Sequence, residues 1–146
     1  MIHISVEIDS TFRITISDET IKKAIHHVFD NEQISSGNVT VIFTSDESLR
    51  AMKNQYFNID AYTDVITFNL EERGEPIDGE IYISPERASE NSIAFGETFD
   101  SEMTRLIIHG TLHLIGYDDQ LPDDLIKMKE REERYLAEVY QPVSPE

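Results

Sequence analysis

The chain has 146 residues and no cysteine, so it forms no disulfide, and any bound metal ion must be held by His, Asp or Glu. Twelve Lys and Arg residues against 29 Asp and Glu residues give a formal net charge of −17, which argues against a protein that binds nucleic acid mainly by charge. No apolar run approaches the roughly 20 residues that span a bilayer, and the first residues do not resemble a signal peptide, so we expect a cytoplasmic protein.

The first half of the chain alternates between strand and helix patterns. Residues 2–8 alternate apolar and polar side chains, as a half-buried strand does, and residues 17–29 repeat apolar side chains at helical spacing behind a Ser/Asp cap. The β-branched segment 38–44 predicts a second strand. Residues 45–57 predict a second helix, whose expected inward side chains are Leu49, Met52 and Tyr56.

Two further strands, at 63–70 and 79–84, flank a segment that contains the Gly, Pro and Asp of a turn. A short helix then starts at Ser84-Pro85 and ends at Gly96. We expect Asp100 or Ser101 to cap the next helix, which runs to Leu114 and is closed by Gly116 in the left-handed conformation.

A final amphipathic helix follows Pro122. Its charged run KEREER is expected to face outward, and its inward side chains are Leu125, Met128, Tyr135, Leu136 and Val139. Residues 141–146 are expected to form a frayed tail. Four strands interleaved with helices indicate a single α/β or α+β layer structure, with helices on at least one face of the sheet.

Two histidines lie four residues apart in the fourth predicted helix. A step of four residues turns a helix by about 400°, so His109 and His113 share one face and both imidazoles can reach one metal ion, as in the zincin helix. A tetrahedral catalytic site has three protein ligands and one open position. Gly116 allows the chain to reverse and to bring Asp119 to that ion, with Asp118 as the alternative ligand or as a residue that orients one. The pattern predicts a metal site; without a metal, each imidazole would need a hydrogen-bond partner in the core.

Gly110 follows the first of these histidines, at the position where the zincin motif carries its Glu general base. Peptide hydrolysis by the usual zincin route therefore lacks its base. A glycine within a helix costs about 1 kcal/mol relative to alanine, so we expect close packing of another backbone, such as a strand, at this point. The remaining histidines, His3, His26 and His27, lack such spacing and are expected to be surface or packing residues.

Three segments resemble one protein family. The YbeY family of metal-dependent bacterial endoribonucleases and rRNA maturation factors has the signature His-Gly-x-Leu-His-Leu-x-Gly-Tyr-Asp-His, from which HGTLHLIGYDD (109–119) differs only in its last residue. The family segment Asn-x-x-Tyr-Arg-x-x-Asp-x-Pro-Thr-Asp-Val-Leu-Ser-Phe resembles NQYFNIDAYTDVITF (54–68), and its Gly-Asp-Ile-x-Ile-Ser strand resembles GEIYIS (79–84). Element order and length also fit, so the likeness covers nearly the whole chain.

The resemblance implies an α+β fold: one domain over residues 1–140, with a mixed sheet of roughly four strands, about five helices, and the metal-binding helix packed on the sheet. It implies one zinc ion per chain, with manganese or nickel as alternatives, bound by His109, His113 and Asp119. The implied activity is cleavage of single-stranded RNA in 16S rRNA 3′-end maturation, late 70S ribosome quality control and 30S assembly. The implied partners are rRNA in the small ribosomal subunit, a small-subunit ribosomal protein and the Era-type GTPase, with no membrane and no DNA.

Two positions depart from the family pattern. Asp119 replaces the third histidine ligand, and its charge lowers the net positive field of the metal on its bound water, which should be less acidic than in a three-histidine site. Phe57 stands where the family usually has an arginine implicated in activity. A phenyl ring cannot stabilise the negative charge of a phosphate, but it can stack on a base.

The leading hypothesis is a single-metal phosphodiesterase that acts on RNA. Candidate catalytic carboxylates, as general base or as orienting groups, are Asp118, Asp60 and Asp64, with Glu80 as a further candidate, and Arg105 lies one turn before the first histidine. The alternatives are a non-catalytic 30S assembly factor with a structural metal, and a metallohydrolase of another substrate class. The acidic composition predicts weak affinity for free RNA, and docking through protein partners would compensate.

Overall fold

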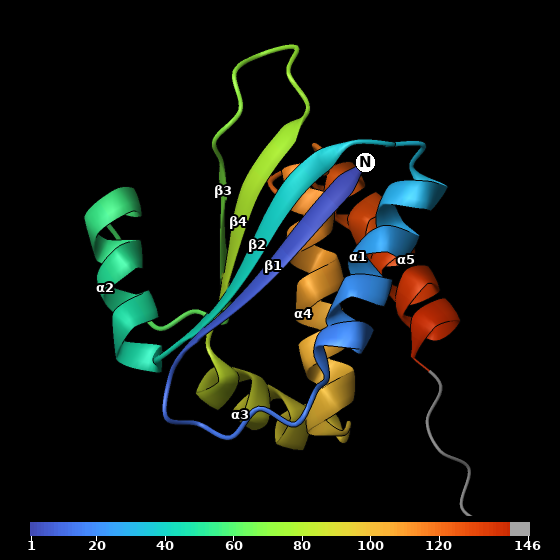
Figure 1. The fold of residues 1–146 in the computed structure, drawn as a ribbon. Coiled ribbons are helices and arrows are strands. Elements are labelled where there is room, and N and C mark those ends of the chain that lie inside the picture. The colour runs from blue at the N-terminus through green and yellow to red at the C-terminus, as the bar shows by residue number, and fades with distance from the viewer. Residues whose placement is uncertain (141–146) are drawn as a thin grey trace, which may run out of the picture.

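Figure 1 shows the computed structural model, which describes residues 1–140, as a four-stranded sheet with helices packed against it. The strands are β1 (Ile2–Asp9), β2 (Gly37–Thr44), β3 (Val65–Asn69) and β4 (Ile77–Ile83), in the spatial order β1-β2-β4-β3. β1, β2 and β4 are parallel, whereas β3 runs antiparallel to β4 at one edge. The predicted α+β class and mixed sheet are confirmed, and the predicted tail at 141–146 lies outside the described residues.

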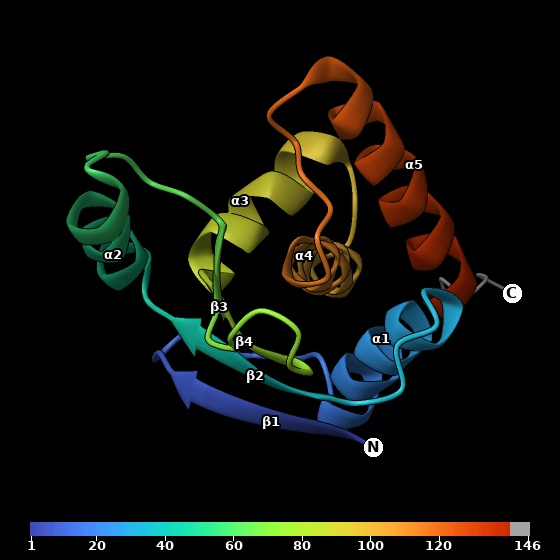
Figure 2. The ribbon, with the colours of Figure 1, turned by 90° about the horizontal axis from the view of Figure 1, so that it is seen from above.

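The helices within the described residues are α1 (Asp18–Asn31), α2 (Asp46–Phe57), α3 (Pro85–Phe95), α4 (Phe99–Leu114) and α5 (Pro122–Val139). Seen from above in Figure 2, α4 lies at the centre of one side of the sheet among α1, α3 and α5, while α2 stands beyond β3. Because α4 has neighbours on nearly every side, it buries apolar residues around most of its circumference, among them Leu106, Ile107, Ile108 and Leu112.

The start of α4 corrects one predicted cap. The cap is neither Asp100 nor Ser101 but Thr98, whose hydroxyl accepts a hydrogen bond from the backbone N–H of Ser101 at 3.1 Å. The Asp100 carboxylate instead accepts a hydrogen bond from the hydroxyl of Thr15, which lies 85 positions away in the sequence. The local pattern predicted that Asp100 caps the helix, but its side chain instead makes a contact with a distant segment.

Two side chains predicted to face inward lie at the surface. Tyr56 on α2 is 59% exposed, and Leu125 on α5 is 39% exposed. Among its apolar side chains α2 buries only Leu49 fully, because this helix stands apart from the other four (Figure 1). Within residues 1–140, none of the helices has the length and hydropathy of a membrane-spanning segment.

Gly110 lets α4 approach the sheet closely. A Cβ atom at this position would lie 2.7 Å from Cγ2 of Ile81 on β4 and 3.3 Å from Cγ2 of Thr67 on β3, and both distances are shorter than an ordinary carbon–carbon contact. The expected packing against a strand is confirmed, although strand side chains rather than strand backbone make the contact. The helix that carries the two histidines is therefore packed on the sheet, as predicted.

Candidate metal centre

The structure brings together the three predicted metal ligands. His109 and His113 lie near the end of α4, and Asp119 lies in the loop that leads to α5; one ligand atom from each residue falls within 4.8 Å of the other two. His113 Nε2 is 3.5 Å from Asp119 Oδ2. Two ligands of a tetrahedral zinc ion, each about 2.0–2.2 Å from the metal, lie roughly 3.3–3.6 Å apart. The separation of His113 from Asp119 therefore matches two ligands of one zinc ion, and His109 is close enough to share that ion.

Hydrogen bonds to Nδ1 of both rings leave Nε2 of each ring for a metal. His109 Nδ1 lies 2.7 Å from a carboxylate oxygen of Glu132, and His113 Nδ1 lies 3.1 Å from the backbone carbonyl oxygen of Tyr117. Because both partner oxygens accept hydrogen bonds, each Nδ1 carries the proton and each Nε2 keeps its lone pair. The ring centroids are 4.7 Å apart and the ring planes are nearly perpendicular, at 78°. Each imidazole is thus oriented by a hydrogen bond at Nδ1, the ring nitrogen that would not bind the metal, as metal-binding histidines usually are.

Glu132 is the functional residue that the sequence prediction missed. The predicted charged outer run of α5 includes it, yet it is only 5% exposed, and it pairs with Arg105 at 3.3 Å as well as with His109. Burial alone would raise the pKa of this carboxyl, but the hydrogen bond and charge of His109 and the charge of Arg105 outweigh burial, so its pKa is lowered. The spacing of Glu132 from Met128 and Tyr135 places all three on the buried stripe of α5, and that spacing was the available signal.

The loop between α4 and α5 is held by hydrogen bonds at Tyr117 and Asp118. Asp118 accepts hydrogen bonds from the backbone N–H groups of Asp119 and Gln120, at 2.7 and 3.1 Å, and so forms the turn that presents Asp119 to the imidazoles. Upstream, the Tyr117 hydroxyl donates a hydrogen bond at 2.7 Å to Glu32, the C-cap residue of α1. Gly116 has φ +112°, the left-handed conformation predicted for the reversal. Asp118 therefore positions the loop, while Asp119 is the carboxylate that faces the histidines.

The surroundings of His113 favour its neutral form. Burial and the neighbouring His109 lower the pKa of the His113 imidazole, and together they outweigh the opposing effect of Asp119. A metal ion binds only the neutral imidazole, so a lowered pKa reduces the competition between protons and the metal.

An open cleft of about 430 Å³ lies against the metal ligands. It runs between the ligand side chains and the edge strand β3, and its other wall comes from α2 and the α2–β3 loop. Asp64 is the predicted catalytic carboxylate that lines this cleft, and its Oδ2 accepts a hydrogen bond from the Asn91 side chain at 3.0 Å. Asp60 pairs with Arg50 at 2.8 Å and is not among the lining residues.

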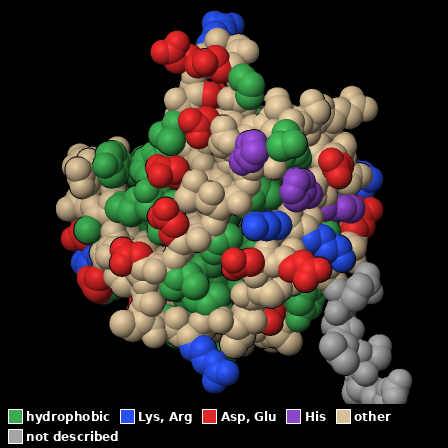
Figure 3. Space-filling view, viewed as in Figure 1, with side chains coloured by type: hydrophobic (Ala, Val, Ile, Leu, Met, Phe, Trp, Pro, Cys, Tyr) green, Lys and Arg blue, Asp and Glu red, His purple; other side chains and the backbone are tan. Residues whose placement is uncertain are grey.

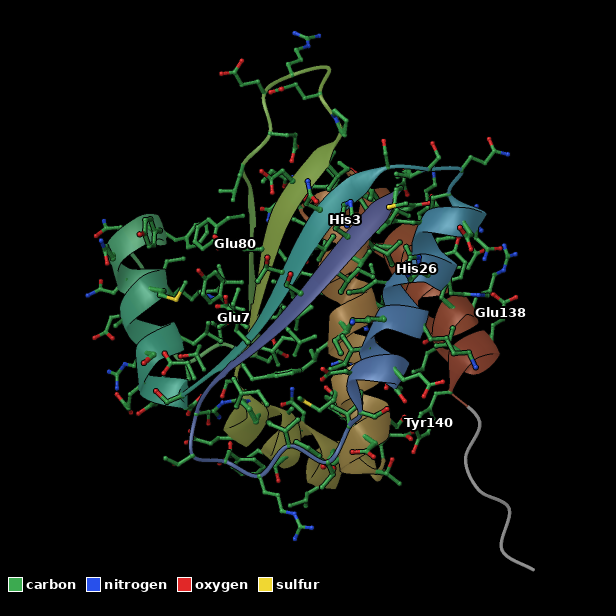
Figure 4. The ribbon with its side chains drawn as sticks, viewed as in Figure 1. His3, Glu7, His26, Glu80, Glu138 and Tyr140 are labelled. Carbon is green, nitrogen blue, oxygen red and sulfur yellow. The ribbon has the colours of Figure 1, made fainter. Side chains whose placement is uncertain are left out.

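The remaining sequence candidates lie away from the cleft. Glu80 alternates on β4 with Gly79 and Ile81, which face α4, so its side chain lies on the opposite face of the sheet (Figure 4). Figure 4 also places His3 on β1 and His26 on α1, both exposed, and Figure 3 shows histidine side chains at the surface of the same face. The prediction was that these histidines are surface or packing residues. Arg105 pairs with Glu102 at 2.5 Å and with Glu132 at 3.3 Å, and it is not among the residues that line the cleft.

Two imidazoles and a carboxylate that converge beside an open cleft, on an α+β fold, define the class of metal-dependent hydrolases. A family model described as Endoribonuclease YbeY matches residues 5–140. The chain is 35% identical to the endoribonuclease YbeY of Salinibacter ruber, with 93% of this chain and 91% of that protein covered. It is 36% identical to the endoribonuclease YbeY of Chlorobaculum parvum, with 92% and 94% covered. The chain therefore belongs to the endoribonuclease YbeY family.

The fold comparison agrees with this assignment. A solution structure of a Thermotoga maritima protein superposes with a TM-score of 0.64 at 29% sequence identity, covering 93% of this chain and 88% of that one. The resemblance found in the three sequence segments is confirmed, and the chain is accordingly a metal-dependent endoribonuclease of a family whose role is rRNA maturation.

Proposed function

We propose that this protein is a zinc-dependent endoribonuclease that cleaves single-stranded RNA in the maturation of the 16S rRNA 3′ end and in late 70S ribosome quality control. The observation that carries the proposal is the convergence of His109, His113 and Asp119 beside the cleft. The proposal includes action on the small ribosomal subunit in the cytoplasm, with an Era-type GTPase and a small-subunit ribosomal protein as partners, and family membership supports it.

A bound zinc ion would supply a Lewis acid for a phosphoryl oxygen and would lower the pKa of water. Asp64 is the residue of this chain best placed to take the proton of the attacking hydroxyl. Asn91 donates a hydrogen bond to Oδ2 of that carboxylate, and the Asp64 side chain lines the cleft. In the balanced reaction, the attacking hydroxyl is that of water: it gives its proton to the carboxylate as its oxygen bonds to phosphorus, the bond from phosphorus to the departing ribose oxygen breaks, and that ribose oxygen takes up a proton.

A purely structural metal is the second candidate role. Closed structural zinc sites carry four protein ligands, whereas three groups converge among residues 1–140, and they do so beside an open cleft. The arrangement leaves a coordination position for water or substrate, which favours catalysis. Hydrolysis of peptides is disfavoured because Gly110 replaces the helix-borne general base.

The test compares cleavage of a fluorescent single-stranded RNA by three variants with cleavage by the wild type. Asp119→Ala should lose zinc and activity together. Asp64→Asn should keep its zinc and lose about 10²- to 10⁴-fold in kcat, the usual contribution of a general base. Asp60→Asn should retain kcat, because its carboxylate pairs with Arg50 outside the cleft lining. EDTA should abolish wild-type activity and zinc should restore it; full activity of the Asp119→Ala variant would overturn the proposal.

A further inference from the structure

Among the residues that the structure describes, one cationic side chain lines the cleft and is available to bind a ligand. This side chain is Lys53 on α2, which lines the cleft together with the predicted metal ligands. It is half-buried, and no carboxylate of the described residues forms an ion pair with it. In a chain with 29 acidic residues, a partly desolvated and unpaired ammonium group beside a metal centre favours an anionic ligand.

Two arginines on the helices that border the cleft, Arg50 on α2 and Arg105 on α4, are already neutralised by ion pairs. Arg50, one turn before Lys53 on α2, pairs with Asp60 at 2.8 Å. Arg105, one turn before His109 on α4, pairs with two carboxylates behind the metal ligands. A phosphate that enters the cleft therefore meets Lys53 as its cationic partner from the protein.

An aromatic ring lies one helical turn beyond this lysine. Phe57 is at position i+4 from Lys53, so both side chains project from the same face of α2, and both line the cleft. The Phe57 ring is 49% exposed. It is stacked on Phe68 of β3 at a centroid distance of 6.2 Å and an interplanar angle of 15°. Phe68 is in turn held edge-on by Tyr56 and Tyr82, at 5.1 and 5.9 Å.

This support fixes the plane of the Phe57 ring while leaving half of its surface open. A supported, exposed aromatic ring is the platform on which single-stranded nucleic acids stack their bases without sequence preference. A lysine beside such a ring can bind the phosphate of the same nucleotide through its positive charge. The pair thus combines the two contacts by which proteins hold single-stranded RNA.

We propose that Lys53 and Phe57 form a nucleotide-binding subsite of the cleft, in which Phe57 stacks on a base and Lys53 binds the phosphate of the same nucleotide. The proposal rests on the proposed function in that RNA is taken as the substrate. The two residues position the RNA chain next to the metal centre and take no part in proton transfer. They act on substrate affinity and leave kcat largely unchanged.

The first experiment measures binding with ligands that contain no phosphodiester, so that it does not depend on turnover. Zinc-loaded protein is titrated with adenosine 5′-monophosphate, with adenosine, and with ribose 5-phosphate, and binding is followed by NMR chemical shifts. The monophosphate should bind the wild type more tightly than either fragment. Lys53→Met should reduce its affinity to that of adenosine, and Phe57→Leu should reduce it to that of ribose 5-phosphate, while Phe57→Trp retains stacking.

The second experiment measures KM and kcat on single-stranded RNA. Phe57→Leu should raise KM about 5- to 150-fold, which corresponds to the loss of one stacked base. Lys53→Met should raise KM and reduce the slope of log affinity against log salt by about 0.7, the value for one phosphate contact on a single strand. The control is Lys129→Met, which removes the same charge from an exposed position on α5.

The two experiments separate the subsite from the proposed function. If zinc-loaded wild type cleaves no RNA, the proposed function fails, and the mononucleotide titration still tests the subsite. If wild type cleaves RNA while both variants keep its KM and its affinity for adenosine 5′-monophosphate, the subsite is wrong. A fall in kcat at unchanged KM would also contradict it.

Discussion

Replacing Glu132 by glutamine removes the negative charge behind His109 while keeping the shape of the side chain. The carboxylate lies 2.7 Å from His109 Nδ1 and is 5% exposed, so the hydrogen bond is charge-assisted and little screened by solvent. Charge-assisted hydrogen bonds are about twice as strong as neutral ones. Loss of such a partner behind a metal-binding histidine typically lowers metal affinity about 10- to 100-fold, or roughly 1.4–2.8 kcal/mol. We expect a loss of zinc affinity in this range for Glu132→Gln.

The assay is competition for zinc against a chromophoric chelator at neutral pH. The matched control is Glu138→Gln, a substitution on the same helix whose carboxylate pairs with His27 at 3.0 Å instead of with a metal ligand. The control should keep the wild-type Kd for zinc. Thermal denaturation in EDTA measures any loss of stability in the metal-free protein separately. An unchanged Kd in Glu132→Gln would refute the argument that this carboxylate orients His109.

Three further predictions concern stability. Zinc at 100 times its Kd should raise the free energy of unfolding by about 2.7 kcal/mol, and equal Tm values in zinc and in EDTA would contradict binding to the folded state. Gly110→Ala should lower the free energy of unfolding by up to about 2 kcal/mol. Overpacking against Ile81 at 2.7 Å costs about 1–3 kcal/mol, and the better helix propensity of alanine offsets about 1 kcal/mol of this. A higher Tm than that of the wild type would contradict this prediction. Burial and a hydrogen bond to Glu32 raise the pKa of the Tyr135 phenol. Its neutral form therefore stabilises the fold below the unfolded pKa of about 10, and this stabilisation is lost as pH rises through the folded pKa. Tyr135→Phe should thus cost about 1 kcal/mol at neutral pH and flatten the alkaline loss of stability in urea titrations, whereas an unchanged alkaline slope would count against this assignment.

Local sequence patterns were enough to predict the strands and the metal-binding helix. The separation of His109 from His113 is a property of one helix, and the left-handed reversal at Gly116 depends on a single residue. Both features hold whatever the rest of the chain does. Gly110 could also be interpreted from the sequence. A glycine within a helix lowers helix stability, so its presence indicated a neighbour that leaves no room for a side chain.

The features that the sequence did not reveal depend on contacts between distant segments. The burial of Glu132 follows from its pairing with His109, 23 positions away. Asp64 lines the cleft and accepts a hydrogen bond from Asn91, 27 positions further along the chain, whereas Asp60 pairs with Arg50. From their charge alone, Glu132 and Asp64 would be expected at the surface. The packing of α5 and α3 against α4 is what brings them to their hydrogen-bond partners.

Elemental analysis of purified wild-type protein beside its Asp119→Ala variant tests the central claim, that two imidazoles and one carboxylate hold a single ion. Removing one of three ligands should drop the metal content from one ion per chain to well below that, while the variant remains folded by circular dichroism. If Asp119→Ala instead retained a full equivalent of metal, the ion would be bound elsewhere and the account of this cleft would be wrong.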